Sequence, residues 1–265
     1  MARHKSASQE LEGFISLAFS LAEITRSVSL HYFRSELRTE TKSDATPVTI
    51  ADRECERQMR ERIAEAYPDH GIIGEELGSE RSQASHVWVL DPIDGTKAFI
   101  SGRPLFGALI ALCRDGVPIL GVIDCPAVDD RWVGVEGRPT THNDMPCHAR
   151  RCERLADALM YSTSPYMFAG DDVAAFDRLR ASVKYPLFGG DCHNYGLLAS
   201  GWIDLVVEAN LNLHDWAALV PIALGAGASI SDWSGRALAF GSDGRVIMAG
   251  DERTHSAAIK VMGGG

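Results

Sequence analysis

One apolar run that ends abruptly in acidic residues constrains the fold of this chain more than any other feature. Residues 87–90 read Val-Trp-Val-Leu, and residues 91–96 read Asp-Pro-Ile-Asp-Gly-Thr. The apolar run predicts a buried strand that ends at Asp91 and Pro92, because proline cannot donate a hydrogen bond to a strand ladder. Asp94 follows three residues after Asp91, so a turn can fold the second carboxylate back toward the first.

The end of this segment also suits a phosphate. Gly95 and Thr96 open a predicted helix, and the backbone N–H groups at a helix start can bind phosphate oxygens. These six residues offer carboxylate and carbonyl oxygens, which suit Mg²⁺, and exposed amides, which suit a phosphate substrate bound to the same ion. For this segment alone the alternative is an ordinary strand-turn-helix, in which Asp94 caps the helix and Asp91 accepts from backbone amides.

Two further acidic segments favour a metal site. Residues 74–78 read Gly-Glu-Glu-Leu-Gly after a strand candidate at 71–74, and Asp215 lies at the start of a predicted helix at 214–224. Taken singly, the first is typical of a solvated acidic loop and the second of a helix cap. Together with residues 91–94 they provide the several acids that hold two metal ions roughly 3.5–4 Å apart in phosphoryl hydrolysis.

Charge and composition exclude several classes of protein. The 265 residues include 36 acids and 26 bases, which gives a net charge of −10 without any basic run. Nucleic-acid and anionic-membrane surfaces need clustered lysine and arginine, so neither partner is expected. No apolar run approaches the roughly 20 residues of a membrane span. The N-terminal segment lacks an apolar stretch and the six cysteines are scattered, so we expect no secretory signal, free thiols and a cytoplasmic location.

Hydrophobic patterns and turn signals predict two helices and several strands in the first half of the chain. A long helix is expected at 8–36. A second helix begins after Thr49, with Asp52 completing a capping box, and Pro68 ends it. The expected strands are 71–74, 87–90, 105–112, 119–124 and 131–135, with a hairpin turn at Asp115-Gly116 between the third and the fourth.

Strands and helices alternate in the second half, which predicts α/β layers. A polar, proline-containing stretch at 140–154 marks the boundary, so we expect one domain at 1–145 and another at 146–265. The expected strands are 158–162, 203–207 and 228–231, and the expected helices are 172–180, 191–199 and 214–224.

These motifs together resemble the inositol monophosphatase superfamily of magnesium-dependent, lithium-sensitive phosphatases. The resemblance rests on Gly-Glu-Glu at 74–76, Asp-Pro-Ile-Asp-Gly-Thr at 91–96, and the Asp215 segment followed by Gly-Ala-Gly-Ala at 225–228. Pro-Val-Thr-Ile-Ala-Asp at 47–52 matches the family's upstream threonine and aspartate element. The match covers the chain from about residue 42 onward, and the motif that follows the buried strand is its most specific part.

The resemblance implies two or three Mg²⁺ ions per active site and a role for each matching residue. Glu75, Asp91 and the Ile93 carbonyl hold the first ion, and Asp91, Asp94 and Asp215 hold the second. A metal-activated water then attacks in line with the leaving oxygen. The other implied roles are catalysis by Glu75 and by Thr96 oriented by Asp52, phosphate binding by Gly95 and Thr96, and substrate binding by Asp191, Glu208, Asp215 and Lys42.

The resemblance also implies a layered αβαβα sandwich and a homodimer. The α+β domain supplies most of the metal ligands, and Asp215 from the α/β domain completes the cleft. The partner implied is a small phosphomonoester substrate, with no nucleic acid and no membrane. Trp132, Trp202 and Phe168 are candidates for apolar contact in a dimer, although each is expected in the core.

Several segments look more like the histidinol-phosphate phosphatase branch of this family. Inositol monophosphatases usually place tryptophan directly before the last metal aspartate, whereas here His214 precedes Asp215 and Trp216 follows it. Asp191 and Glu208 can pair with the ammonium and imidazole of L-histidinol phosphate, unless Asp191 only caps the following helix. The segments that resemble this branch are 99–107, 123–126, 131–132, 191–195 and 217–222.

The sequence therefore predicts a Mg²⁺-dependent phosphomonoesterase that releases L-histidinol and phosphate in histidine biosynthesis. An inositol-1-phosphate phosphatase is the alternative within the same class. A non-catalytic metal-binding regulator is the alternative from another class. Such a regulator would be expected to lack at least one of five residues that are all present: Glu75, Asp91, Asp94, Asp215 and Thr96.

Overall fold

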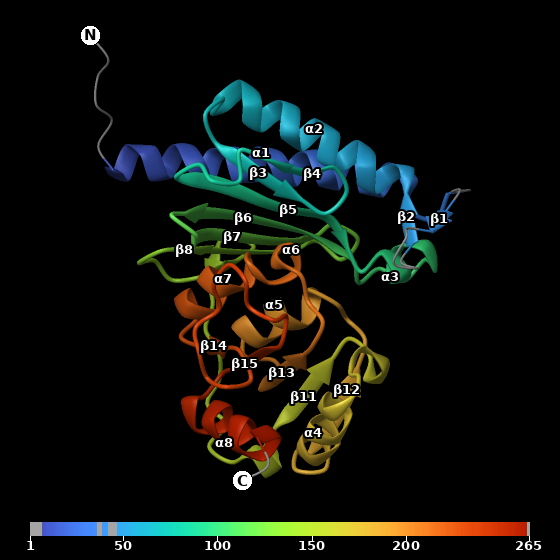
Figure 1. Cartoon of the computed structure of the whole chain (residues 1–265), viewed down its shortest axis with the longest axis vertical. Coiled ribbons are helices and arrows are strands. Elements are labelled where there is room, and N and C mark those ends of the chain that lie inside the picture. Colours follow the sequence, from blue (N-terminus) through green and yellow to red (C-terminus); the bar gives the residue numbers. More distant parts are fainter. Residues whose placement is uncertain (1–6, 36–38, 42–46, 264–265) are drawn as a thin grey trace.

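The computed structural model describes residues 7–35, 39–41 and 47–263, which form two main sheets and the helices that cover them (Figure 1). The helices are α1 (Ala7–Tyr32), α2 (Ile50–Ala66), α3 (Thr96–Ile100), α4 (Asp171–Arg180), α5 (His193–Ala199), α6 (Leu213–Trp216), α7 (Leu219–Gly225) and α8 (Glu252–Gly263). Two 3₁₀ turns, η1 (Leu155–Asp157) and η2 (Pro165–Met167), precede α4.

The first large sheet has eight strands in the order β10-β9-β8-β7-β6-β5-β3-β4, and a short pair, β1 with β2, lies apart from it. All its neighbours pair antiparallel except β3 with β5. The strands are β1 (Thr39–Thr41), β2 (Pro47–Thr49), β3 (Gly71–Gly74), β4 (Gly78–Glu80), β5 (His86–Asp94), β6 (Gly107–Arg114), β7 (Val117–Cys125), β8 (Asp130–Val135), β9 (Thr141–His142) and β10 (Met145–Pro146).

The second sheet has five strands in the order β12-β11-β13-β15-β14. Strand β11 runs parallel to both of its neighbours, whereas β15 runs antiparallel to β13 and β14. The strands are β11 (Leu159–Ser162), β12 (Tyr185–Phe188), β13 (Leu205–Glu208), β14 (Ser229–Ser231) and β15 (Val246–Ala249).

Helices and sheets alternate in five layers, which confirms the predicted αβαβα sandwich. In Figure 1, α1 and α2 lie above the eight-stranded sheet, and α5, α6 and α7 lie between the two sheets. Below the five-stranded sheet, α4 and α8 form the last layer. Residues 71–146 supply the first large sheet and residues 159–249 the second. The division into domains at 145 and 146 stays a prediction.

Both faces of the eight-stranded sheet are buried, which explains the continuous apolar run in β5. Trp88 and Leu90 pack with α1 and α2 on one face, whereas Val87 and Val89 join the core between the two sheets. Alternate strand residues point to opposite faces, so a strand covered on both sides must be apolar throughout.

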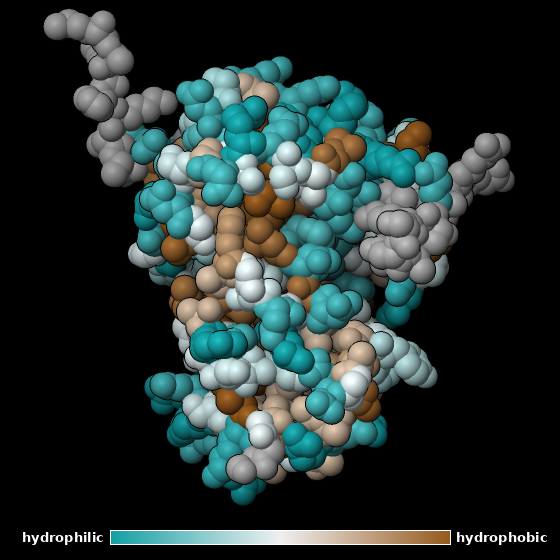
Figure 2. Space-filling model, viewed as in Figure 1, coloured by the Kyte–Doolittle hydropathy of each residue, from teal (hydrophilic) through white to brown (hydrophobic). Residues whose placement is uncertain are grey.

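Figure 2 shows a mainly hydrophilic outer surface, with apolar residues exposed near its middle.

Two local predictions are confirmed. Helix α2 begins after Thr49, whose side chain caps it, and Asp52 completes the capping box from the third helical position. The turn between β6 and β7 places Asp115 at φ 50° and Gly116 at φ 80°. Two consecutive positive φ values are those of a tight hairpin turn, which aspartate and glycine favour.

The predicted end of the first helix is wrong. Helix α1 ends at Tyr32 rather than at residue 36, because Arg34 adopts a left-handed backbone with φ 59°. The Arg34 guanidinium donates two hydrogen bonds, of 3.1 and 3.0 Å, to the carbonyl oxygen of Gly102. A contact with a loop far along the chain therefore accompanies the end of this helix.

The predicted helix at 214–224 is two helices. Helix α6 ends at Trp216 and α7 begins at Leu219. Pro221 lies within α7 and has no N–H to donate to the carbonyl four residues earlier, at Ala217, so the hydrogen-bond ladder is interrupted there.

The sequence did not indicate β12, β15 or α8. The prediction that three large aromatic residues lie in the core is wrong for one of them. Trp132 and Phe168 are buried as expected, but Trp202 is 66% exposed. Among the residues that the structure describes, no helix combines the length and the apolar character of a membrane span.

A ring cluster at the outer face of the first large sheet contains a histidine held neutral. His70 stacks on Tyr67 at 4.5 Å and on His86 at 5.0 Å between ring centroids. The indole N–H of Trp88 donates to His70 Nδ1 at 3.2 Å, so this nitrogen accepts and carries no proton. Burial, and then the neighbouring His86, lower the pKa of His70 to about 4.

We expect this histidine to destabilise the fold in acid. The pKa of His70 lies below its unfolded value of about 6.5, so the stabilisation is complete above that pH and is lost as pH falls toward 4. Because His70 is only half-buried, we expect a loss of roughly 1–2 kcal/mol between pH 7 and pH 4.5. Urea unfolding at both pH values measures it. His70→Asn keeps an acceptor for Trp88 and should lack this loss, and equal losses in both proteins would contradict the prediction.

Candidate active site

Three carboxylates meet where the first large sheet faces the middle helices. One carboxylate oxygen from each of Asp91, Asp94 and Asp215 lies within 4.8 Å of the others. Asp91 and Asp94 come from the end of β5, and Asp215 comes from α6. Two of the acidic segments singled out in the sequence are therefore adjacent in space, although about 120 residues separate them along the chain.

A β-bulge puts two of these carboxylates on the same side. The prediction that the strand ends at Asp91 is wrong, because β5 continues to Asp94. Asp91 lies opposite Leu109 and Asp94 opposite Gly107, so β5 has one more residue than β6 over this interval. Pro92 lies within the bulge, where no ladder N–H is needed.

Glu75, from the third acidic segment, lies beside Asp91. The backbone N–H of Glu75 donates to the Leu90 carbonyl oxygen at 3.1 Å, which ties the loop after β3 to the end of β5. Glu75 lies close enough to Asp91 that its negative charge raises the pKa of the Asp91 carboxyl. The carboxylate cluster thus extends to a fourth acid.

The crowding of these acids strongly disfavours their charged forms. Burial raises the pKa of Asp91 well above its usual value, and Glu75, Asp94 and Asp215 raise it further. Burial, and then Asp215, raise the pKa of Asp94 to about 7. Such a cluster attracts positive charge, and its hard oxygen donors are those that Mg²⁺ prefers. The residues present therefore fit a divalent cation.

A buried glutamate that the sequence analysis missed anchors the loop that carries Glu75. Glu56 of α2 accepts hydrogen bonds from the backbone N–H of Glu76 at 2.7 Å and of Leu77 at 3.1 Å, and from Arg60 Nε at 2.8 Å. A Cβ at Gly74 would lie 2.0 Å from Glu56 Oε1, so only glycine fits there. The signal available in the sequence was helical spacing, which places Glu56 and Arg60 on the same face of α2 as the apolar residues Cys55, Met59 and Ile63.

Asp52 and Thr96 do not make the contact expected of them. Asp52 Oδ2 accepts from the N–H of Thr49 at 2.9 Å and from its hydroxyl at 2.5 Å. Within the described part of the chain, the buried Asp52 Oδ1 has no hydrogen-bond partner. The Thr96 hydroxyl instead donates to the Ile93 carbonyl oxygen at 3.2 Å. Among the described residues no hydrogen bond joins Thr96 to Asp52, and the orientation of Thr96 by Asp52 stays a prediction.

Gly95 and Asp191 approach each other across the site. Gly95 has φ 79°, and a Cβ there would lie 3.0 Å from Asp191 Cγ, so both its conformation and its surroundings require glycine. Asp191 itself has φ 46°. The next residue, Cys192, donates its backbone N–H to Asp94 Oδ2 at 2.6 Å. The segment before α5 therefore packs directly against the end of β5.

The N-cap positions of α3, α5 and α6 are not occupied by the aspartates considered as caps. Cys192, not Asp191, is the N-cap of α5, so the predicted helix start at residue 191 is wrong, because Asp191 has a left-handed backbone. Gly95, not Asp94, is the N-cap of α3, while Asp91 does accept from the Ile93 N–H at 3.1 Å. Asp215 completes a capping box, since its Oδ2 accepts from the Asn212 N–H at 2.6 Å, and it also belongs to the carboxylate cluster.

A small acidic cavity of about 80 Å³ adjoins the carboxylate cluster. Glu208, at the end of β13, is buried there; its Oε1 accepts from the Thr163 N–H at 2.8 Å and its Oε2 from the Tyr195 hydroxyl at 3.0 Å. Burial raises the pKa of Glu208 to about 7, and burial and Asp94 raise that of Asp191 to about 7. The cavity is lined by Asp94, Asp191, Glu208 and Asp215, together with Thr163, Met167, Cys192, Tyr195 and Leu211.

The structure thus brings together most of the predicted site residues. Glu75, Asp91, Asp94 and Asp215 form one cluster, while Asp191 and Glu208 line the cavity beside it. Ile93, Gly95 and Thr96 follow Asp91 directly along the chain. Lys42 lies outside the described residues.

Comparisons with known proteins find related phosphatases. The sequence model of the inositol monophosphatase family matches residues 10–263. The bifunctional phosphatase IMPL2, chloroplastic, of Arabidopsis thaliana is 44% identical over 95% of this chain and 75% of its own length. A histidinol-phosphatase of Chlorobaculum parvum is 35% identical over 88% and 90%. Among solved structures, an inositol monophosphatase from Zymomonas mobilis gives a TM-score of 0.89 at 45% identity and covers 98% of this chain and 100% of its own.

Proposed function

Because this chain belongs to the inositol monophosphatase family of phosphatases, we propose that it is a Mg²⁺-dependent phosphomonoesterase that hydrolyses L-histidinol phosphate to L-histidinol and phosphate. One observation carries the proposal: the carboxylate cluster opens into a cavity lined by two further acids, Asp191 and Glu208. The first feature suits a phosphate bound through metal, and the second suits a positively charged alcohol. The 35% identity to a histidinol-phosphatase supports the choice of substrate.

Five residues would hold the metal. They are Glu75, Asp91, Asp94 and Asp215 through carboxylate oxygens and Ile93 through its carbonyl, and two or three ions fit the proposal. Bound Mg²⁺ would stabilise charge on the phosphoryl oxygens and lower the pKa of water. The raised pKa values of Asp91 and Asp94 support this assignment, because a cation would relieve the repulsion that causes them.

The remaining groups of the chain position the ester. Gly95 has no side chain and is the N-cap of α3, so a phosphate can approach its N–H and that of Thr96 closely. The Thr96 hydroxyl, held by the Ile93 carbonyl, lies beside the proposed metal ligands and can hold the attacking water in line. Among the described residues no group donates a hydrogen bond to Asp52 Oδ1, so this oxygen can take a proton or a hydrogen bond during the reaction.

The leaving alcohol would occupy the acidic cavity. Asp191 and Glu208 are both disfavoured in their charged forms by burial, so a cationic substrate regains the electrostatic energy that these carboxylates lose. L-Histidinol carries an ammonium and an imidazole, either of which can pair with them. Met167 and Leu211 add apolar surface for the carbon skeleton.

Inositol 1-phosphate is the second candidate substrate. The 45% identity to an inositol monophosphatase of known structure favours it specifically. Carboxylates also accept hydrogen bonds from hydroxyl groups, so the same cavity can hold a polyol. A polyol leaves the charges of Asp191 and Glu208 uncompensated, which is why we rank it second.

A homodimer, a cytoplasmic location and separate domains at 1–145 and 146–265 complete the proposal.

Steady-state kinetics on the two esters with Mg²⁺ tests the choice of substrate. A hydrogen bond to a charged group contributes about 1.5–3 kcal/mol, so we expect kcat/KM for L-histidinol phosphate to be at least about tenfold higher than for inositol 1-phosphate. Phosphate release from glycerol 2-phosphate, which has a small uncharged alcohol, serves as the reference. A higher kcat/KM for inositol 1-phosphate would overturn the assignment.

A further inference from the structure

We propose that Trp233 is a positioning residue for Glu208. It holds the backbone at the end of β13 and lies outside the substrate cavity. The inference rests on the proposed function, because it gives Glu208 the task of binding a positively charged group of the substrate. It concerns the backbone at the end of β13, whereas Thr163 and Tyr195 hold the Glu208 carboxylate itself.

The indole N–H of Trp233 joins the ends of two strands. It donates to the carbonyl oxygen of Glu208 at 3.2 Å and to that of Val246 at 3.3 Å. Glu208 is the last residue of β13 and Val246 the first of β15, and the two residues lie opposite each other in the antiparallel ladder. A strand end is free to fray unless its last carbonyls are bonded. Trp233 therefore holds the residue from which the Glu208 side chain enters the site.

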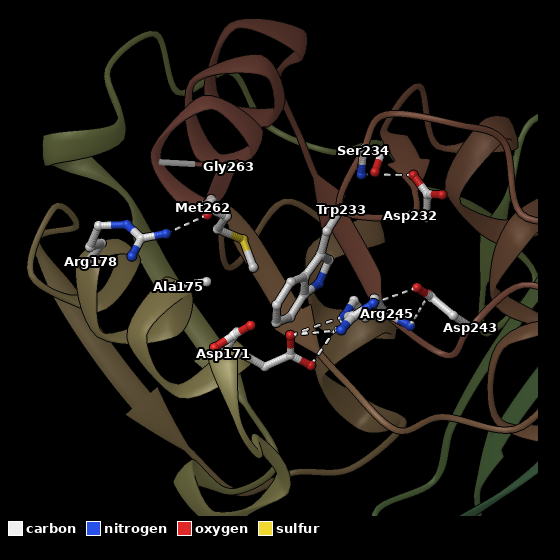
Figure 3. Close-up of a pocket in the computed structure, with 11 residues that line it drawn as sticks. Asp171, Ala175, Arg178, Asp232, Trp233, Ser234, Asp243, Arg245, Met262 and Gly263 are labelled. Carbon is white, nitrogen blue, oxygen red and sulfur yellow. Dashed lines mark hydrogen bonds and ion pairs between the residues drawn. The ribbon is translucent and has the colours of Figure 1, made fainter. Parts of the chain in front are cut away.

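Neighbouring residues hold the Trp233 ring in place on the side of the five-stranded sheet that faces away from the substrate cavity. The ring faces a second cavity of about 280 Å³ between α4 and α8, where Figure 3 shows it at the centre of the lining residues. The Arg245 guanidinium lies 5.7 Å from the ring centroid. Arg245 is held in turn by ion pairs to Asp172 at 2.9 Å and Asp243 at 2.7 Å. These charges fix the indole without touching the substrate.

Trp233 also packs near the segment that carries Met167, an apolar residue of the substrate cavity. Its ring lies 6.0 Å from that of Phe168, which stacks on Phe176 at 3.9 Å between centroids. Phe168 follows Met167, which lines the substrate cavity. The residue therefore supports both the acidic and the apolar part of the proposed alcohol site while contributing no atom to its lining.

Replacement of the indole N–H while keeping a ring tests this role. A neutral hydrogen bond contributes about 0.5–1.5 kcal/mol, so we expect Trp233→Phe to raise KM for L-histidinol phosphate about three- to tenfold. We expect kcat to change less than twofold, and KM for glycerol 2-phosphate to stay unchanged. Trp202→Phe is the matched control, because Trp202 is 66% exposed, and it should leave both KM values unchanged.

A double-mutant cycle with Glu208→Gln separates positioning from general packing. If Trp233 acts through the Glu208 carboxylate, Trp233→Phe should have no further effect on KM in the Glu208→Gln background. Equal rises in KM for L-histidinol phosphate and for glycerol 2-phosphate would overturn the inference. The same rise in KM in the wild-type and in the Glu208→Gln background would also overturn it. If Trp233→Phe fails to fold, β-(3-benzothienyl)alanine at position 233 alone keeps the ring area without the N–H and makes the same test.

Failure of this inference is distinguishable from failure of the proposed function. The proposed function fails in the wild-type protein alone, if L-histidinol phosphate is a poorer substrate than inositol 1-phosphate. The inference fails if the cycle is additive with whichever of these two esters the protein prefers. The two outcomes come from separate measurements on the same set of proteins.

Discussion

Asp94→Asn is expected to lower kcat by about three orders of magnitude while the protein stays folded. The substitution removes one negative charge from the three-carboxylate cluster, and a metal ligand set contributes several kcal/mol to the transition state of phosphoryl transfer. Asparagine keeps a side-chain oxygen that can accept the hydrogen bond now donated by the Cys192 N–H. Phosphate release from L-histidinol phosphate measures the effect, and retention of most activity would mean that the catalytic centre has been misidentified.

The stability of this variant provides a second readout with the opposite sign. The pKa of Asp94 is raised to about 7, above its unfolded value near 3.8, so its charged form destabilises the fold as pH rises through this range. At pH 8 without metal, Asp94→Asn should therefore have a Tm at least equal to that of the wild type. Added Mg²⁺ should raise the Tm of the wild type more than that of the variant. Asp177→Asn, at an exposed ion pair with Arg180, should behave as wild type in every measurement.

Glu56→Ala is expected to cause the largest loss of stability, about 3–5 kcal/mol in the free energy of unfolding. The buried carboxylate accepts from two loop N–H groups and from Arg60, which also donates to the Gly78 carbonyl. Its removal leaves two backbone donors without their acceptor and takes from Arg60 one of its two carboxylate partners, the other being the more exposed Glu80 at 2.9 Å. Because the same loop carries Glu75, kcat should fall as well.

Urea unfolding measures this loss, with Glu54→Ala as the control on the same helix. Glu54 pairs with Arg57 at the helix surface, where both side chains are substantially exposed, so its loss should cost less than about 1 kcal/mol. A loss below about 1 kcal/mol for Glu56→Ala as well would show that this glutamate does not anchor the loop. Glu56→Gln, which retains one acceptor oxygen, should fall between the two.

Sequence reasoning succeeded where the determinants are local or where apolar patterning is strong. The capping box of Thr49 and Asp52 and the turn at Asp115-Gly116 depend on a few adjacent residues, and both are present. The apolar run in β5 reports burial on both faces. The convergence of Asp91, Asp94 and Asp215 was inferred from residue type and from resemblance, and the structure places their carboxylates together.

What sequence reasoning missed depends on partners distant along the chain. The bulge at Pro92 exists only against β6, so a proline that locally signals a strand end lies inside a longer strand. Glu56 acts on a loop about 20 residues further on, and its own helix gives little sign of that. The left-handed backbone of Asp191 follows Gly189 and Gly190, which also have positive φ, and its contact with Gly95 is invisible to local propensity.

Removal and return of the metal show whether the acid cluster is a Mg²⁺-dependent phosphatase site. Wild-type protein is treated with EDTA, freed of chelator, and assayed for phosphate release from L-histidinol phosphate as MgCl₂ is returned. We expect no phosphate release above background without metal and a saturable return of activity with Mg²⁺. Undiminished release without metal, or no release from either ester at saturating Mg²⁺, would contradict this expectation.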